Sequence, residues 1–382
     1  MTPIYLDHAA TTPVDPRVLD AMLPFFTTHF GNAASAHHAF GKYAHEAIEQ
    51  ARMHVATALA ADPREIVWTS GATESNNLAL QGIAFSPYYA KRGNHIITVA
   101  TEHKAVLDCC AFLETRGIKV TCLPVDGGGR VDLHQLADAI TSETILVSVM
   151  HANNETGVLQ PIREIGALCT AREVLFHTDA TQSFGKVPID IERDRIDLLS
   201  LSAHKIYGPK GVGALYVRRK GPRVRCTPLV HGGGHEGGLR SGTLNVPGIV
   251  GLGCAANIAT GEMDTEQARI RQLRDHLEAE LIARGPCTIT RNGAPHDRLA
   301  GFANLSFEGI VADQFMVRLP QLAVSARAAC TSAVRQPSYV LAAMGCDEAR
   351  VAGAIRLSLG RGTTRAEIDE AIRAIVEALS RD

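Results

Sequence analysis

A lysine between a buried-looking strand and a Gly/Pro turn is the first candidate for chemistry. Lys205 follows the apolar run 197–200 and precedes the turn 208–211. A cleft at the end of such a strand would desolvate the amine, lower its pKa and favour the nucleophilic neutral form. Ser202 and His204 could donate hydrogen bonds to a phosphate beside it. On its own, the motif also fits a loop lysine in solvent, which is the commoner fate of this residue.

Two further segments place polar side chains at strand ends. At 69–77, small residues lead from a strand into a helix pattern, and Gly71 would let backbone N–H groups and the Thr73 hydroxyl approach a phosphate. A plain helix cap is the alternative. Asp179 closes an apolar strand, where a carboxylate needs a cation such as a protonated pyridine nitrogen. The alternative for Asp179 is an ordinary cap for the helix that follows.

A histidine and a cysteine complete the candidates. His103 at a strand end could stack on a planar cofactor and move protons near neutral pH, although a lone histidine is more often a cap or a surface residue. Cys330 lies among small residues with Arg327 nearby, which favours a thiolate. Taken singly, it fits a buried structural cysteine better. None of the nine cysteines forms a Cys-x-x-Cys pair, and no metal site is predicted.

The composition narrows the classes of partner. The chain has 382 residues, 46% of them hydrophobic, which is enough for two domains or for one large domain with a smaller lobe. The net charge is -2 without a long block of like charge, so neither nucleic acid nor a membrane is expected as a partner. No apolar run could cross a bilayer and the start lacks a signal-peptide pattern, so we expect a cytoplasmic protein with reduced thiols.

The elements that must position these residues alternate in type. Apolar runs typical of strands covered on both faces lie at 66–69, 95–99, 145–149, 174–177, 197–200 and 213–217. Helical patterns lie between them, one from Asp132 and one after Pro161. After about residue 260, Leu273, Leu277 and Leu281 mark a long helix, and Thr364 with Glu367 opens a last one. The pattern predicts an α/β domain with a largely parallel sheet and a smaller α+β lobe.

Together these segments resemble the cysteine desulfurase branch of the class V aminotransferases. This pyridoxal-phosphate family includes the sulfur donors of iron–sulfur cluster and nitrogenase cofactor assembly. The resemblance covers nearly the whole chain and follows one order of motifs. The matching segments are 5–13, 30–32, 71–75, 101–103, 153–157, 179–182, 204–205, 232–236, 240–243, 329–332 and 355–360.

The resemblance implies fold type I of the pyridoxal-phosphate enzymes, an α/β fold in two parts. The large cofactor-binding domain would span 15–258, with a mostly parallel seven-stranded sheet between helices. The smaller α+β domain would combine 1–14 with 259–382 and carry the loop of Cys330.

The resemblance also implies a role for each candidate residue. Lys205 would bind pyridoxal 5′-phosphate covalently, and Cys330 would take the sulfur of L-cysteine as a persulfide while L-alanine leaves. Asp179 would pair with the ring nitrogen, and His103 would stack on the ring and relay protons. The remaining cofactor contacts would come from Ala72, Thr73, Ser202, Ala203 and His204 at the phosphate and from Gln182 and Asn154 at the ring. Arg356, with Asn154, would clamp the substrate carboxylate.

Partners follow from the same resemblance. Thr243 matches a residue that reaches the phosphate of the partner subunit, so a homodimer is implied. A sulfur-acceptor protein is implied as well, for iron–sulfur cluster, thio-cofactor or tRNA synthesis. The chain departs from the family pattern at Ala203, Gly237 and Arg327, where glycine, arginine and glycine are common. It also ends at Asp382 without the extension that housekeeping relatives use to dock their scaffold, which favours a different acceptor.

Two other functions compete with this interpretation. A selenocysteine lyase, or another class V lyase or transaminase, would keep the cofactor and change the reaction. A degenerate, non-catalytic subunit would still bind the cofactor and would serve as a sulfur-relay scaffold. Cys330 argues against a transaminase, which needs no thiol, and the intact set of lysine, aspartate, histidine, arginine and cysteine argues against a decayed subunit.

Overall fold

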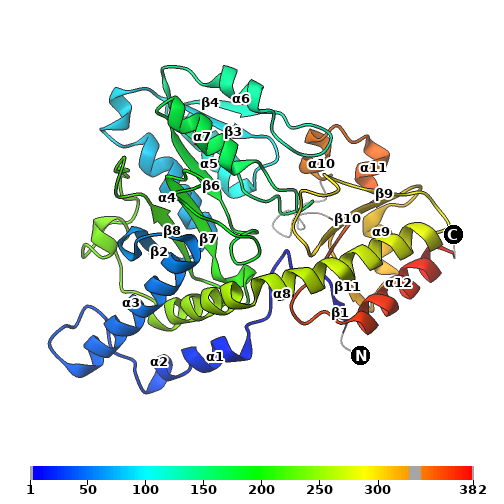
Figure 1. Cartoon of the computed structure of the whole chain (residues 1–382), viewed down its shortest axis with the longest axis horizontal. Helices are drawn as coiled ribbons and strands as arrows, with labels where there is room; N and C mark the ends of the chain where they lie inside the picture. Colours follow the sequence, from blue (N-terminus) through cyan, green and yellow to red (C-terminus); the bar gives the residue numbers. More distant parts are fainter. Residues whose placement is uncertain (1–2, 327–336, 381–382) are drawn as a thin grey trace.

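The computed structural model describes residues 3–326 and 337–380. Its main feature is a seven-stranded sheet with the order β2-β8-β7-β6-β5-β3-β4 (Figure 1). The five strands β3 to β7 run parallel, and β8 is antiparallel to both β2 and β7. The strands are β2 (Ile66–Thr69), β3 (His95–Val99), β4 (Lys119–Leu123), β5 (Thr144–Ser148), β6 (Leu175–Asp179), β7 (Leu198–Ser202) and β8 (Gly213–Val217). The mostly parallel seven-stranded sheet is therefore confirmed.

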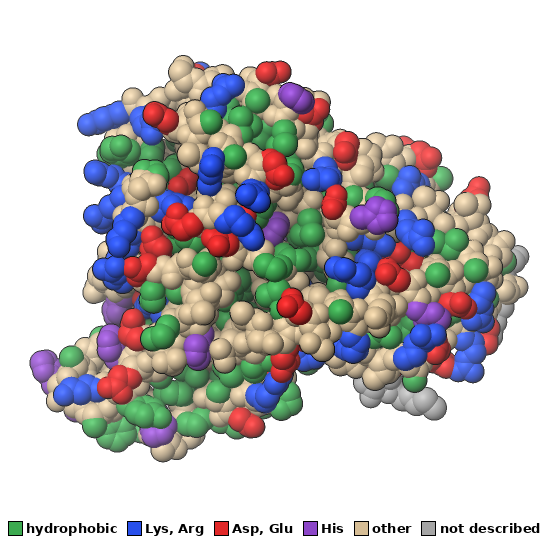
Figure 2. Space-filling model, in the orientation of Figure 1, with side chains coloured by type: hydrophobic (Ala, Val, Ile, Leu, Met, Phe, Trp, Pro, Cys, Tyr) green, Lys and Arg blue, Asp and Glu red, His purple; other side chains and the backbone are tan. Residues whose placement is uncertain are grey.

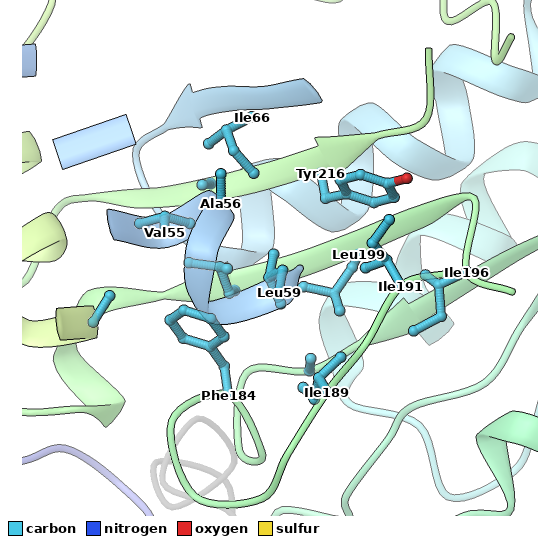
Figure 3. Packing of buried hydrophobic residues seen from close by; sticks show 14 of the residues in the cluster. Val55, Ala56, Leu59, Ile66, Phe184, Ile189, Ile191, Ile196, Leu199 and Tyr216 are labelled. Atoms are coloured by element: carbon cyan, nitrogen blue, oxygen red, sulfur yellow. The ribbon is translucent and has the colours of Figure 1, made fainter. Parts of the chain in front are cut away.

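Helices cover both faces of this sheet, as the continuous apolar strands predicted. Successive residues of a strand point to opposite faces, so Leu198 packs in the core under α4 and α5, whereas Leu199 packs in the core under α3 and α7. Figure 3 shows the second core, where Leu59 of α3 lies beside Leu199 of β7 and Tyr216 of β8. The helices along this part of the chain are α1 (Pro16–Met22), α2 (Pro24–Thr27), α3 (Ala39–Leu59), α4 (Ala72–Ala84), α5 (Lys104–Glu114), α6 (Leu133–Ala139) and α7 (Ile162–Ala171).

All six predicted strands are present, with bounds within two residues of those expected. The helices at Asp132 and after Pro161 are also confirmed, and the Asp132 side chain accepts hydrogen bonds from the backbone N–H groups of His134 and Gln135. One strand of the seven-stranded sheet, β4, is not predicted by the sequence. It lies at the edge of the sheet, and most of its side chains are exposed or half-buried, so its sequence lacks the apolar run that marked the others.

A smaller sheet has the antiparallel order β12-β10-β9. One face is covered by the second half of α8 and by α12 (Arg365–Leu379), whose capping box between Thr364 and Glu367 confirms the predicted start of the last helix. The other elements of this part are β1 (Ile4–Tyr5), β9 (Ile289–Arg291), β10 (Phe302–Phe307), α9 (Ala312–Val317), β11 (Leu322–Ala323), α10 (Tyr339–Ala343), α11 (Glu348–Ala352) and β12 (Ala354–Ser358).

Helix α8 (Val246–Arg284) joins the two sheets as one continuous element, drawn in yellow-green across Figure 1. The leucines 273, 277 and 281 mark only its second half, and its first half packs against α1 and α3. The domain boundary expected between residues 258 and 259 therefore falls inside this helix, and the division into two domains stays a prediction. None of the described helices is long and apolar enough to span a membrane.

Candidate active site

A cavity of about 490 Å³ opens at the carboxyl ends of the parallel strands β5, β6 and β7. In open α/β sheets, ligands bind at this edge, because the loops that leave the strands converge there. The sequence-predicted residues that line it are Ala72, Thr73, His103, Asn154, Asp179, Gln182, Ser202, His204, Lys205 and Arg356. The fold thus gathers ten of the predicted residues, which span 285 positions of the chain, around one space.

Lys205 reaches this cavity from the short turn that follows β7. Its Nζ donates hydrogen bonds of 2.6 Å to the carbonyl oxygens of Ala9 and Ala10 in the N-terminal segment. Burial, helped by the positive charges of Lys186 and Arg356, lowers the pKa of the Lys205 amine to about 7. A neutral, nucleophilic amine is therefore available near neutral pH, as expected for a lysine at a buried strand end.

Asp179 is the last residue of β6, and both of its carboxylate oxygens are engaged. Oδ1 accepts the backbone N–H of Thr181 at 2.9 Å, and Oδ2 accepts Nδ2 of Asn76 at 2.7 Å. Asn76 is fully buried on α4, and we did not predict it from the sequence. A signal was present, since two polar residues, Ser75 and Asn76, interrupt the apolar side of that helix, but the sequence does not show which strand they face.

His103 occupies the N-cap of α5, where its Nδ1 accepts the backbone N–H of Ala105 at 3.1 Å. Burial lowers the pKa of this imidazole, so the neutral ring is favoured. A ring whose Nδ1 accepts a hydrogen bond carries its proton on Nε2, which leaves that nitrogen as the donor. His103 therefore acts both as the helix cap that a lone histidine suggested and as a lining residue of the cavity.

The start of α4 forms one wall of the cavity. Gly71 precedes the helix with a φ of 152°, a conformation that favours glycine, and Ala72 and Thr73 follow in the first turn. Free N–H groups at a helix start attract anions. His204 faces the same space, and burial, followed by the charges of Lys205 and Lys210, lowers its pKa to about 4.

Two predicted cofactor residues are not brought to this cavity. Ala203 is completely buried, and its backbone N–H already donates to the carbonyl oxygen of Val212 at 3.1 Å. Thr243 is exposed and does not line the cavity of its own chain. Cys330, predicted as the sulfur-accepting nucleophile, lies outside the described residues.

Arg356 enters the cavity from the middle of β12, and its side chain is only 2% exposed. Nη1 donates to the carbonyl oxygen of Asn154 at 2.7 Å, and Nη2 donates to Oδ1 of Asp7 at 2.8 Å. Nε has no hydrogen-bond partner among the described residues. The bonds to Asn154 and Asp7 use two of the five N–H groups of this buried guanidinium, so at the wall of a cavity it is suited to bind a carboxylate.

The polar atoms left without partners test whether a cofactor fits here. Within the described part of the chain, Oδ1 of Asn154, Oγ1 of Thr181 and Oε1 of Gln182 are buried at the cavity wall and accept or donate no hydrogen bond. Buried polar groups are normally satisfied, so these atoms indicate a polar ligand. An amine, a carboxylate and an anion-attracting helix start match the aldehyde, the ring nitrogen and the phosphate of pyridoxal phosphate.

One family of proteins matches the chain over most of its length. The family model described as "Aminotransferase class-V" matches residues 4–371. The chain belongs to the class V aminotransferase family. Enzymes of this family use pyridoxal phosphate, in agreement with the cavity.

Relatives within the class V family cover nearly the whole chain. The protein named "Cysteine desulfurase IscS" of Rickettsia bellii is 52% identical over 379 residues, which is 99% of this chain and 92% of that protein. A solved structure described as a NifS-like protein superposes with a TM-score of 0.92 at 40% identity and covers all of both chains. Another, described as SspA in complex with cysteine, has a TM-score of 0.82 at 41% identity, over 93% of this chain and 98% of that one.

Proposed function

We propose that this chain is a cysteine desulfurase, which converts L-cysteine to L-alanine and takes the sulfur on Cys330 as a persulfide. One observation carries the proposal: the amine, carboxylate, imidazole and guanidinium of Lys205, Asp179, His103 and Arg356 surround a single cavity. The 52% identity to a protein named cysteine desulfurase supports it, as does the likeness to SspA, whose structure is described as a complex with cysteine.

Pyridoxal phosphate would be held at three points of the cavity. Lys205 would bind its aldehyde carbon and Asp179 its ring nitrogen, while the first turn of α4, together with Ser202 and His204, would hold its phosphate. Ala203 would support this site only through packing, because its N–H is already used. When bound, the cofactor supplies an electron sink for the bonds at the substrate Cα.

The protein's own groups handle protons and orientation. With a pKa of about 7, the amine of Lys205 can both accept and return a proton at neutral pH. The Nε2–H of His103 can donate to a group in the cavity, since its Nδ1 is occupied by the backbone N–H of Ala105. Arg356 would hold the substrate carboxylate and so orient the bonds at Cα, which turns binding energy into positioning.

The sulfur step moves the sulfur atom of the substrate from its carbon to the thiol of Cys330. The thiolate of Cys330 would attack the sulfur of the substrate, so an S–S bond forms as the C–S bond breaks. The electron pair of the broken bond stays with the carbon skeleton, which takes up a proton and leaves as L-alanine. The sum is L-cysteine plus the Cys330 thiol giving L-alanine plus the Cys330 persulfide, with no added oxidant. An acceptor protein would then take the sulfur and restore the thiol.

A homodimer is part of the proposal. Large apolar side chains are exposed together on α1, on α2, in the loop after α2 and at the start of α3. They include Phe26 of α2 at 58% and Phe30 of the loop at 66%, and Figure 2 shows hydrophobic side chains gathered over α1 and α2. Patches of this kind on a folded chain are typical of protein interfaces. Thr243 is exposed and outside the cavity of its own chain, so it is free to serve a second copy.

The decisive experiment is a stoichiometric assay with purified protein loaded with pyridoxal phosphate. We expect one L-alanine for each sulfur transferred and a mass increase of one sulfur atom on the peptide that contains Cys330. Reduction with borohydride should leave the cofactor covalently fixed on Lys205. Lys205→Ala should make no alanine, and Cys330→Ala should not form the persulfide. Selenocysteine assayed in parallel distinguishes a lyase from a desulfurase.

Three results would contradict the proposal. Cofactor fixed at a lysine other than Lys205 would contradict the assignment of Lys205 as the attachment site. Alanine release by the parent protein that does not exceed the background of Lys205→Ala would point to a scaffold without catalysis. Alanine formed from selenocysteine but not from cysteine would make the chain a selenocysteine lyase.

A further inference from the structure

Asp7 lies between the guanidinium of Arg356 and the hydroxyl of Ser325, and each oxygen of its carboxylate serves one of them. Oδ1 accepts Nη2 of Arg356 at 2.8 Å, and Oδ2 accepts Oγ of Ser325 at 2.9 Å. We propose that Asp7 is a positioning residue that sets both the substrate-carboxylate clamp and the anchored start of the segment that leads to Cys330. This inference rests on the proposed function and extends it to a residue with no assigned role.

The backbone brings three distant segments together at this point. Strand β1 pairs in parallel with β11, and the N–H of Leu6 continues that ladder to the carbonyl oxygen of Ala323 at 2.9 Å. On the other side, the N–H of His8 donates to the carbonyl oxygen of Ser358 in β12. Asp7 therefore lies in an extended segment held between β11 and β12.

Ser325 and Arg356 are also joined directly to each other. The N–H of Arg356 donates to the carbonyl oxygen of Ser325 at 2.7 Å, and the N–H of Ser325 donates back to the carbonyl oxygen of Arg356 at 3.2 Å. This pair of bonds is an antiparallel bridge, and it fixes the two residues side by side. The carboxylate of Asp7 adds a side-chain link to the same pair, so the three residues form one closed unit.

Charge and burial explain why the link to Arg356 matters. The guanidinium is 2% exposed, and Asp7 is its salt-bridge partner among the described residues, with a side chain that is 16% exposed. Removing one member of a buried ion pair leaves an uncompensated charge, so the remaining group moves or loses its orientation. Arg356 without Asp7 would offer its unused Nε in a poorly defined direction.

The link to Ser325 concerns the second half of the reaction. Ser325 precedes the predicted nucleophile Cys330 by five positions. Cys330 itself is outside the described residues, so the inference covers the anchor and not the thiol. Because Asp7 bonds both Arg356 and Ser325, one residue positions the carboxylate clamp and the start of the segment that leads to Cys330. Loss of Asp7 is therefore expected to impair both steps, whereas loss of the Ser325 hydroxyl is expected to impair only the second.

The test separates these two steps with holoenzyme variants Asp7→Ala, Asp7→Asn and Ser325→Ala. Binding of L-alanine, which has the carboxylate but no sulfur, is measured by isothermal titration calorimetry. Sulfur transfer is measured as the rate at which the Cys330 peptide gains one sulfur atom in a single turnover with L-cysteine. The matched control is Asp20→Asn, which neutralises an exposed aspartate on α1.

Asp7→Ala should raise the Kd for L-alanine about ten-fold or more and slow sulfur transfer, since charge-assisted hydrogen bonds to a buried group are among the stronger ones. Asp7→Asn keeps the shape and should lie between Asp7→Ala and the parent protein, which decides the matter if the alanine variant does not fold. Ser325→Ala should keep the Kd within about two-fold and slow only sulfur transfer. Asp20→Asn should match the parent protein in both measurements.

An unchanged Kd in both Asp7 variants would overturn the role at Arg356, and normal sulfur transfer in Ser325→Ala would overturn the role of the anchor. A parent protein that forms no persulfide from cysteine would instead overturn the proposed function. Alanine binding still tests the Asp7–Arg356 link in that case, so the two failures are distinguishable.

Discussion

Asn76 of α4 and Asp179 of β6 are joined by a hydrogen bond of 2.7 Å between Nδ2 and Oδ2, and both residues are buried. The bond ties the helix whose start faces the proposed phosphate site to the carboxylate proposed for the ring nitrogen. Because Oδ1 is also occupied, by the N–H of Thr181, the orientation of Asp179 is set before any ligand binds.

Removing this amide should weaken cofactor binding. In Asn76→Ala, the buried carboxylate loses a donor, and a hydrogen bond to a charged group contributes about 1.5–3 kcal/mol. We expect the Kd for pyridoxal phosphate, measured by equilibrium dialysis of the apoprotein, to rise at least about ten-fold. The control is Asn94→Ala, which removes a surface amide bonded to the carbonyl oxygen of Gly117. Equal Kd values for the two variants would contradict the assigned role.

The pKa of Lys205 predicts how covalent attachment of the cofactor depends on pH. An ordinary lysine is protonated until about pH 10.4, whereas the lowered pKa of Lys205 is about 7. The attachment rate should therefore rise about ten-fold per pH unit below 7 and level off above about pH 8. Borohydride trapping followed by mass spectrometry of the Lys205 peptide measures it. The rate for 6-aminohexanoate in the same buffers corrects for titration of the cofactor, and a rise that continues to pH 10 would refute the prediction.

Lys186 supplies part of that shift, so its removal should move the midpoint. Burial is the main cause of the low pKa of Lys205, and the charge of Lys186 is the next. Burial lowers the pKa of Lys186 itself to about 8, so it is mostly charged at pH 7. Lys186→Met should raise the midpoint of Lys205 attachment, because a repelling cation is lost. Lys42→Met, at an exposed site on α3, should leave the midpoint in place.

The core under α3 should tolerate little loss of volume. Leu59 is completely buried, where it packs near Leu199 and Tyr216. Leu59→Ala should lower the free energy of unfolding by about 2–5 kcal/mol, because the apolar contacts are lost and a cavity remains. Val317→Ala, at a side chain that is 79% exposed, should change it by less than about 0.5 kcal/mol. Denaturant unfolding of the apoprotein gives both values.

Charges on the apolar patch should separate the proposed subunits. The double variant Phe26→Glu, Phe30→Glu replaces two phenylalanines that are largely exposed in the single chain with carboxylates. Light scattering after gel filtration should show a monomer, with cofactor affinity reduced because Thr243 no longer reaches a partner. Val317→Glu, on α9 in another part of the molecule, serves as the control and should remain a dimer. A double variant that stays dimeric would exclude this patch as the interface.

Much of the fold follows from local pattern. Strands buried on both faces appear as apolar runs, so β2, β3, β5, β6, β7 and β8 could be predicted from the sequence, whereas the half-exposed edge strand β4 could not. The regular leucines predict only the second half of the long helix α8. Its first half is rich in glycine and alanine, which pack closely against α1 and α3 without a marked apolar stripe.

The candidate site divides in the same way. The sequence by itself determined which chemical groups were available. Lys205, Asp179 and His103 each lie at the end of an apolar strand, where a buried polar side chain is costly unless it has a partner. Only the tertiary structure decided that Asn76 orients Asp179, that Ala203 has no N–H to offer, and that Asp7 links Arg356 to Ser325. Periodicity records whether a side chain is buried. Its partner depends on how elements far apart in the chain pack, and no local pattern carries that information.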